Sequence, residues 1–176
     1  MTGRYSIPSA RGHPFGAVRS EVGGSVERVR AALAAAGHPD TIIRFPAGTR
    51  TAVDAAVAVG CTVGQIAKSI VFRYGTRAVL VITSGANRVD SARVEAALGI
   101  KLGRGDAEWV RQTTGFAIGG VAPVGLLSSP MMLLDEDLLA LDPIWAAAGS
   151  PNHVFRTRAS ELMRITGAKA VLVKAM

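Results

Sequence analysis

The order of hydrophobic and polar residues divides this chain into short segments with two different periods. Apolar residues spaced three or four apart indicate helices, and short apolar runs rich in β-branched side chains indicate strands. Helices are expected to begin after Ser25, Thr51, Asp90 or Ser91, and Asp106, with a further helix at 161–166. Glycines that can end these helices stand at 37, 60, 99, 115 and 167. Strands are expected at 41–45, 67–74, 78–83, the start of 116–120, the start of 131–141, 144–149, 153–157 and 168–175.

Turns and helices both connect the expected strands. The tripeptide "GTR" separates 67–74 from 78–83 and indicates a hairpin, so these two strands should be antiparallel neighbours. The strict strand–helix alternation of a doubly wound sheet is missing. We therefore predict an α+β fold with a mixed, largely antiparallel sheet and surrounding helices. Residues 23–176 would form a single domain, and residues 1–22, rich in Gly, Pro, Ser and Arg, a flexible N-terminal arm.

Composition agrees with one domain and adds a charge signal. The 176 residues are 49% hydrophobic, enough for a sizeable core, and the formal net charge is +7. Such an excess of cations favours an anionic partner such as a nucleic acid, although an arginine-rich proteome would produce it as well. Sixteen of the twenty basic residues are arginines, and only four are lysines.

Neither a membrane span nor a secreted location is expected. The stretch 112–134 carries no charged residue and is long enough to cross a bilayer, but it contains four glycines and two prolines. A lipid-exposed helix could not satisfy its backbone with so many breakers, so we interpret it as a core segment that contains a loop. Cys61 is the single cysteine, which excludes an internal disulfide, and the N-terminus lacks a signal-peptide core, so we expect a cytoplasmic protein.

Several kinds of chemistry lack their motifs in this sequence. No GxGxxG follows a strand, "GFAIGGV" lacks the Lys-Ser/Thr of a nucleotide-binding loop, and no GxSxG is present. The histidines at positions 13, 38 and 153 do not follow metal-ligand spacing. The sequence therefore predicts neither a metal nor a cofactor. A catalytic triad made of residues far apart in the sequence is not excluded.

Lys68 interrupts an apolar strand pattern in "GQIAKSIVF". It could lie on the solvent side of an edge strand, which is the common place for a charged strand residue. It could also point into a cleft and offer its ammonium to a carbonyl, carboxylate or phosphate. Burying an ammonium without such a partner is costly, so the second interpretation implies a ligand.

Two glycine-containing loops are the other candidates for a binding site. In "GGVAPVG", residues 119–125, the glycines let the backbone come close to a ligand, and Pro123 stiffens the turn. Amide donors in such a loop could stabilise an oxyanion. The loop could equally be an ordinary connection between strands, and "AAAGSPNH" at 146–153 could be no more than a turn.

Taken in order, these motifs resemble a known family. The segments "VGCTVGQIAKSIVF", "VDSARVEAALG", "TTGFAIGGVAPVGL" and "LLALDPIWAAAGSPNHVFRTRASELMRITGA" are similar to the YbaK-like aminoacyl-tRNA editing domains, which also occur fused to prolyl-tRNA synthetases. The resemblance covers roughly residues 25–174. It implies a partly barrel-like mixed sheet and hydrolysis of a wrongly attached amino acid from tRNA, in trans when the domain stands alone.

The resemblance also assigns roles to individual residues. It implies Lys68 and Gly120 as catalytic residues. Substrate-binding roles would fall to Ser69, Gly119, Val121, Pro123, Gly125, Gly149 and Ser150. Some members that remove cysteine have a hydroxyl residue near the position of Ala146–Ala148 here, so either Ser150 takes that role or the amino acid specificity differs.

The mechanism implied by the resemblance needs no metal. Amides of 119–125 would hold the ester carbonyl, Lys68 would anchor the terminal adenosine phosphate or the carbonyl region, and water or the tRNA 2′-hydroxyl would attack. The expected partner is a mischarged tRNA, such as prolyl-tRNA or a similar tRNA that carries a wrong small amino acid, with an aminoacyl-tRNA synthetase as a second candidate partner. The alternative is a non-catalytic module of the same fold that binds tRNA or a synthetase.

Overall fold

The computed structural model describes residues 21–46 and 51–176, and for residues 21–23 it describes the backbone alone. The helices are α1 (Glu21–Ala35), α2 (Ala52–Val59), α3 (Ser91–Leu98), α4 (Ala107–Thr114) and α5 (Ala159–Thr166), with short 3₁₀ turns η1 (Val63–Gln65) and η2 (Glu136–Ala140). The strands are β1 (Ile42–Arg44), β2 (Ile66–Tyr74), β3 (Arg77–Ser84), β4 (Met131–Asp135), β5 (Ile144–Ala147), β6 (His153–Thr157) and β7 (Lys169–Val171).

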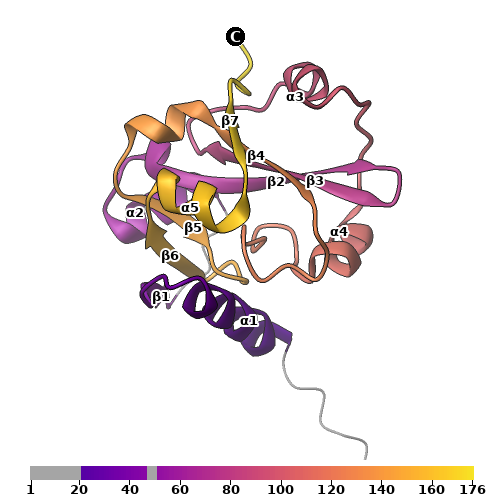
Figure 1. Ribbon diagram of the computed structural model, residues 1–176. Coiled ribbons are helices and arrows are strands. Elements are labelled where there is room, and N and C mark those ends of the chain that lie inside the picture. The colour runs from indigo at the N-terminus through magenta and orange to yellow at the C-terminus, as the bar shows by residue number, and fades with distance from the viewer. Residues whose placement is uncertain (1–20, 47–50) are drawn as a thin grey trace, which may run out of the picture.

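The strands of the described ranges form one mixed sheet in the order β1-β6-β5-β2-β3-β4-β7 (Figure 1). Antiparallel pairs join β1 to β6, β6 to β5 and β2 to β3, and parallel pairs join β5 to β2, β3 to β4 and β4 to β7. The β2–β3 hairpin is the longest ladder of the sheet. The predicted α+β fold with a mixed, mostly antiparallel sheet is confirmed, because the three antiparallel ladders hold more residue pairs than the three parallel ones. The sheet stays open, with β1 and β7 at its two edges.

Both faces of the sheet are covered by helices. Side chains alternate along β3, so that Leu80 and Ile82 face one way and Val79 and Val81 face the other. The first face packs against apolar residues of α1, α4 and α5 and forms the larger core. The second face packs against α3, and a smaller cluster joins α2 to the beginning of β2 and to β5. Figure 1 shows α5 on one side of the sheet, with α1 and α4 below it.

Local capping signals determine where most helices begin and end. Thr51 and Asp54 form a reciprocal capping box at the start of α2, and Gly60 ends that helix in the left-handed conformation. Asp90 caps α3 and Asp106 caps α4, each through a side-chain oxygen that accepts a backbone N–H. These boundaries confirm the predictions made from the sequence, because a cap depends on residues only a few positions apart.

Three expectations about local structure are wrong. The first helix begins at Glu21 rather than after Ser25, whose hydroxyl instead donates to the carbonyl of Gly149 at 2.7 Å. Residues 116–118 form no strand, because the Phe116 N–H bonds to the Thr114 hydroxyl and its ring is buried in the core. The closing strand is shorter than 168–175. Of the predicted arm, residues 1–20 lie outside the described residues.

The uncharged stretch 112–134 contains the end of α4, a loop and most of β4, as expected for a core segment that contains a loop. Among the described residues, no helix has the length and apolar character that crossing a membrane requires.

Candidate functional site

A cavity of about 250 Å³ lies beside β2, close to the point where β5 ends. Its walls come from α2, from β2, from the loop at 118–121, from β5, and from the turn and strand at 150–154. Of the residues predicted for a site, it brings together five: Lys68, Ser69, Gly119, Val121 and Ser150. These come from three segments that are separated by up to 82 positions of sequence, so the cavity is a product of the fold.

The short pairing between β2 and β5 exposes this part of β2. β5 pairs with β2 only at Ile66 and Ala67, and from Lys68 onward β2 has its hairpin partner on the other side. Successive side chains of a strand point to opposite faces, so Lys68 and Ser69 diverge. Lys68 is on the same face as Ile66 and the smaller cluster with α2, and Ser69 is on the face of the main core.

Lys68 is half-buried and, in the part of the chain that the structure describes, makes neither a hydrogen bond nor an ion pair. Its cross-strand neighbour is Thr83, whose hydroxyl donates instead to the buried carboxylate of Asp135 at 2.9 Å. The ammonium of Lys68 therefore borders the cavity without a counter-charge among these residues. The hydroxyl of Ser69 is also buried and lacks a hydrogen-bond partner there. The Lys68 ammonium is thus available to a ligand, whereas the Ser69 hydroxyl is buried on the other face of the strand.

The 118–121 loop provides backbone amides at the cavity wall. The N–H of Gly120 donates to the carbonyl of Ala117 at 3.0 Å and closes a turn, so this amide is already used. The N–H groups of Gly119 and Val121 donate to no group in the described ranges, and both residues line the cavity. Gly120 itself packs against the backbone of Ser150 and joins the two loops.

The remaining predicted residues lie behind the cavity and do not line it. Pro123 is buried inside the loop. Gly125 and Gly149 pack on α1: a β-carbon on Gly125 would come within 3.0 Å of the Arg28 carbonyl oxygen, and one on Gly149 within 2.7 Å of the Ser25 carbonyl oxygen. The positions of these glycines fit a role in holding both loops against the helix.

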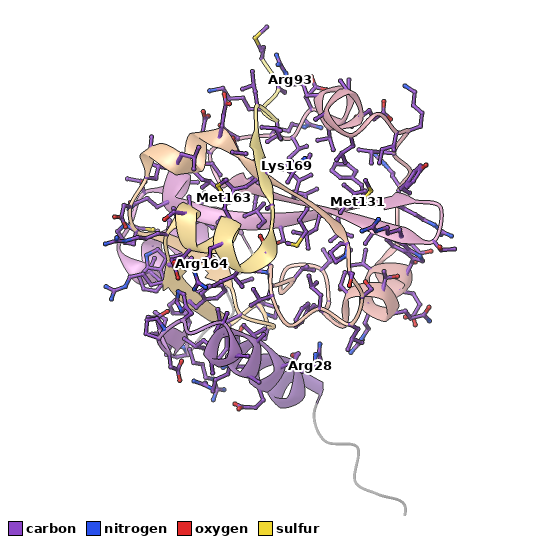
Figure 2. The ribbon with its side chains drawn as sticks, in the orientation of Figure 1. Arg28, Arg93, Met131, Met163, Arg164 and Lys169 are labelled. Carbon is purple, nitrogen blue, oxygen red and sulfur yellow. The ribbon has the colours of Figure 1, made fainter. Side chains whose placement is uncertain are left out.

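Arg28 on α1 links the first of these loops to the helix. Its guanidinium donates to the carbonyl oxygens of Gly115 at 2.7 Å and Gly125 at 3.3 Å, and it stacks 4.9 Å from the ring centroid of Phe116. Figure 2 shows Arg28 on α1 at the lower side of the molecule. Carbonyl contacts and a cation–π contact from one side chain stabilise the loop in a single arrangement.

His153 was not predicted as a site residue, yet it lines the cavity. Its Nδ1 is hydrogen-bonded to the hydroxyl of Ser150 at 2.6 Å, and that hydroxyl also accepts the N–H of Asn152 at 3.1 Å. Burial lowers the pKa of His153 from its ordinary value of 6.5, and the positive charges of Arg44 and Arg30 lower it further. The imidazole is therefore neutral at pH 7 and can accept a proton. In the sequence, the spacing of Ser150 and His153 in "GSPNH" was the one signal of this pair.

These groups together suit the binding of a polarised carbonyl or a small anion. A cation and two unused amides can hold oxygen atoms, and a neutral imidazole can take a proton from an attacking oxygen. Among the described residues, no three or more His, Cys, Asp or Glu side chains are grouped so that they could hold a metal ion.

Solved structures with this fold include relatives at substantial sequence identity. A structure described as "a putative trans-editing enzyme for prolyl tRNA synthetase" matches with a TM-score of 0.82 and 44% identity, over 86% of this chain and 98% of that one. The hypothetical protein APE2540 matches with a TM-score of 0.78 and 24% identity, over 84% of this chain and 99% of that one, which shows a shared fold alone.

Sequence comparison leads to the family. The uncharacterized protein YwhH of Bacillus subtilis (strain 168) is 28% identical over 146 residues, which is 82% of this chain and 93% of that protein. The model of the aminoacyl-tRNA editing domain matches residues 46–165, well over half of the chain, and this range includes the cavity residues of α2, β2, the 118–121 loop and the 150–154 segment. The chain therefore belongs to the aminoacyl-tRNA editing domain family.

Proposed function

We propose that this protein is a trans-editing deacylase that hydrolyses the ester between a tRNA and a wrongly attached small amino acid. The tRNA would be tRNAPro or a similar tRNA. Membership of the editing family supports the proposal, as does the similarity to a structure named for prolyl tRNA synthetase. The observation that carries it is the single cavity into which Lys68, His153 and the 118–121 loop converge.

The size of the cavity favours a small acyl group. Its volume of about 250 Å³ is below the roughly 300–1,000 Å³ of pockets that enclose drug-sized ligands. Ile66, Ile70 and Trp145 make part of the cavity wall apolar, so burying a compact apolar side chain against them would be favourable. A large aromatic amino acid would compete for the same space with the ribose to which it is attached.

The polar groups of the wall suit the two ends of the ester. Lys68 would anchor the carbonyl region or the phosphate of the terminal adenosine, because its ammonium has no other partner in the described part of the chain. The amides of Gly119 and Val121 would stabilise the oxyanion that forms on the carbonyl oxygen. The sequence predicted Gly120 as a catalytic residue, but its amide N–H already donates to the carbonyl of Ala117, so we do not assign the oxyanion to it. Ser69 would form part of the wall of the substrate pocket.

His153 offers the base that the sequence did not reveal. If the Nδ1 proton is donated to Ser150, then Nε2 is an acceptor and can take a proton from water or from the tRNA 2′-hydroxyl. Water adds to the carbonyl carbon, the ester C–O bond breaks, and the 3′-oxygen of the tRNA leaves with a proton. The products are the free amino acid and an intact tRNA.

A non-catalytic module that holds tRNA or a synthetase is the second candidate. It would use the net positive charge of the chain and the same cavity, but it would not release amino acid. In either role we expect a cytoplasmic protein, because aminoacyl-tRNA is made and used there.

A deacylation screen tests the proposal. tRNAPro transcripts charged in turn with glycine, alanine, serine, cysteine and proline are incubated with the purified protein, and loss of the labelled amino acid is measured against the spontaneous rate. We expect acceleration for at least one small wrong amino acid and not for proline. If every ester decays at its spontaneous rate while tRNA still binds, the protein is a binding module.

A further inference from the structure

Arg44 on β1 lies directly opposite His153 on β6, and His153 belongs to the wall of the candidate cavity. The Phe45 N–H donates to the Asn152 carbonyl at 2.8 Å, just beyond this pair. Arg44 and His153 are therefore a non-hydrogen-bonded pair of an antiparallel ladder, in which the two side chains share a face and are closest to each other. The fold thus brings a guanidinium group next to the imidazole of the candidate site.

The charge of Arg44 acts on this imidazole. Burial is the largest cause of the lowered pKa of His153, and the positive charge of Arg44 comes next. Arg44 itself is exposed, on a strand at the edge of the sheet. An exposed cation therefore lies close to a residue that lines the cavity.

Arg44 has no acidic partner among the described residues. Its side chain makes neither a hydrogen bond nor an ion pair within 21–46 and 51–176. Arg30 on α1 also lowers the pKa of His153, but its guanidinium is paired with Asp40 and Glu27. Of the two arginines that act on His153, Arg44 is thus the one whose charge is available to an anion.

The substrate of the proposed function carries an anion close to its ester. In a 3′-aminoacyl nucleotide, a single ribose separates the ester from the 5′-phosphate. Burying a phosphate is costly, so it is best bound where water still reaches it, and a guanidinium can bind two of its oxygens at once. The exposed Arg44 meets both conditions better than the half-buried Lys68 does.

We propose that Arg44 binds the phosphate of the 3′-terminal nucleotide beside His153, and that Lys68 is thereby left to the ester carbonyl. This rests on the proposed function, and it chooses between the two roles given there to Lys68. His153, which neighbours Arg44 and lines the cavity, would then lie between the phosphate and the ester. In that position the imidazole could take the proton of a water molecule or of the 2′-hydroxyl.

The test compares two analogues in which an amide replaces the ester: 3′-alanylamino-3′-deoxyadenosine with and without a 5′-phosphate. The ratio of their Kd values isolates the contribution of the phosphate. It is measured at one low ionic strength for the full chain as wild type, Arg44→Gln, Arg44→Lys and Lys68→Ala. The matched control is Arg156→Gln, which removes the same charge from an exposed residue of β6 that points to the opposite face from His153.

The wild type should bind the phosphorylated analogue about tenfold more tightly than the other, as a charge-assisted contact at an exposed site allows. Arg44→Gln should lose this preference, and Arg44→Lys should keep part of it, because an ammonium has the charge without the paired geometry. Lys68→Ala should weaken the binding of both analogues by the same factor and so keep the ratio. Arg156→Gln should behave as the wild type, and thermal melts should show that the variants remain folded.

A preference that survives in Arg44→Gln and disappears in Lys68→Ala would overturn the inference, because the phosphate would then lie at Lys68. A preference lost in Arg156→Gln would overturn it too, as would a wild type that binds both analogues equally or binds neither. The measurement needs no hydrolysis, so a non-catalytic module that holds the same 3′ end would give the same ratios. Failure of the proposed function appears instead in the deacylation screen, as decay of every ester at its spontaneous rate.

Discussion

Gly120 lies against the backbone of Ser150, so that the two loops of the candidate site touch at this point. A β-carbon on Gly120 would come within 2.8 Å of the Ser150 Cα and 2.9 Å of its carbonyl carbon. Ser150 in turn holds His153 through its hydroxyl. The glycine therefore contacts the residue that is hydrogen-bonded to the imidazole, without lining the cavity itself.

Gly120→Ala should lower both stability and activity. The methyl group meets backbone atoms that cannot move aside cheaply, so the free energy of unfolding should fall by about 1–3 kcal/mol. For a domain of this size, each kcal/mol lowers Tm by roughly 2–4 °C. Deacylation should fall as well, because a displaced Ser150 no longer orients His153.

Gly24→Ala is the matched control for this prediction. A β-carbon at Gly24, inside α1, meets nothing within 4 Å, so alanine should be neutral or stabilising by up to about 1 kcal/mol. The close contact between the loops would be refuted by a Gly120→Ala protein with the melting temperature and the turnover of the wild type.

Lys68→Ala should separate stability from activity. The half-buried ammonium makes no bond in the described part of the chain, so its removal should leave Tm unchanged or raise it. Single-turnover deacylation should fall by about 10²–10³-fold, because a positioned charge acts where the charge of the substrate lies or develops. Lys68→Arg should restore little, since a planar guanidinium does not replace a compact ammonium in a small cavity.

Melts and turnover are measured on the same preparations of both Lys68 variants. Unchanged turnover in Lys68→Ala would contradict the proposed mechanism and return Lys68 to the role of a solvated strand residue.

The lowered pKa of His153 predicts an acid limb in the rate profile. If the neutral imidazole is the base, kcat/KM should rise with pH with a midpoint below 6.5, the ordinary value for histidine. His153→Gln should lose this limb together with most of the activity. A midpoint at or above 6.5, or an unchanged profile in the variant, would remove His153 from the mechanism.

The stability of the protein should also depend on the protonation of His153 and should fall as the pH falls. The unfolded chain binds the His153 proton at a higher pH than the folded chain does, so the stabilising contribution is complete above 6.5 and is lost as the pH falls toward the folded pKa. The Tm advantage of wild type over His153→Gln should therefore narrow between about pH 7.5 and 5.5. An advantage that does not change with pH would contradict the lowered pKa.

Chelation should leave the activity intact. The described residues offer no group of three or more His, Cys, Asp or Glu side chains that could hold a metal ion, and the proposed mechanism uses none. Deacylation rates are compared with and without EDTA. Activity that EDTA abolishes and zinc restores would contradict the mechanism.

The sequence by itself determined the elements whose signals are local. Thr51 with Asp54, and Asp106, identified the starts of helices, and "GTR" identified the hairpin, because caps and turns join residues only a few positions apart. The interruption of an apolar strand by Lys68 also marked a candidate site, since a charge among apolar neighbours is visible in the sequence alone.

Contacts between distant segments decided the rest. Ser25 looked like a helix cap but lies inside α1, and its hydroxyl donates to the carbonyl of Gly149, 124 positions away. The apolar run at 116–118 looked like a strand, but the core takes the Phe116 ring and a turn closes at Gly120.

Which residues line the cavity depended most of all on tertiary structure. His153 reaches it because β6 pairs with β5 and β5 pairs with β2 through only two residues, which leaves the wall at Lys68 open. Gly125 and Gly149, which the sequence predicted as substrate-binding residues, pack on α1 and do not line the cavity. A glycine needed for a ligand and one needed for a helix have the same local pattern, and only the neighbour that fills the space beside it separates the two.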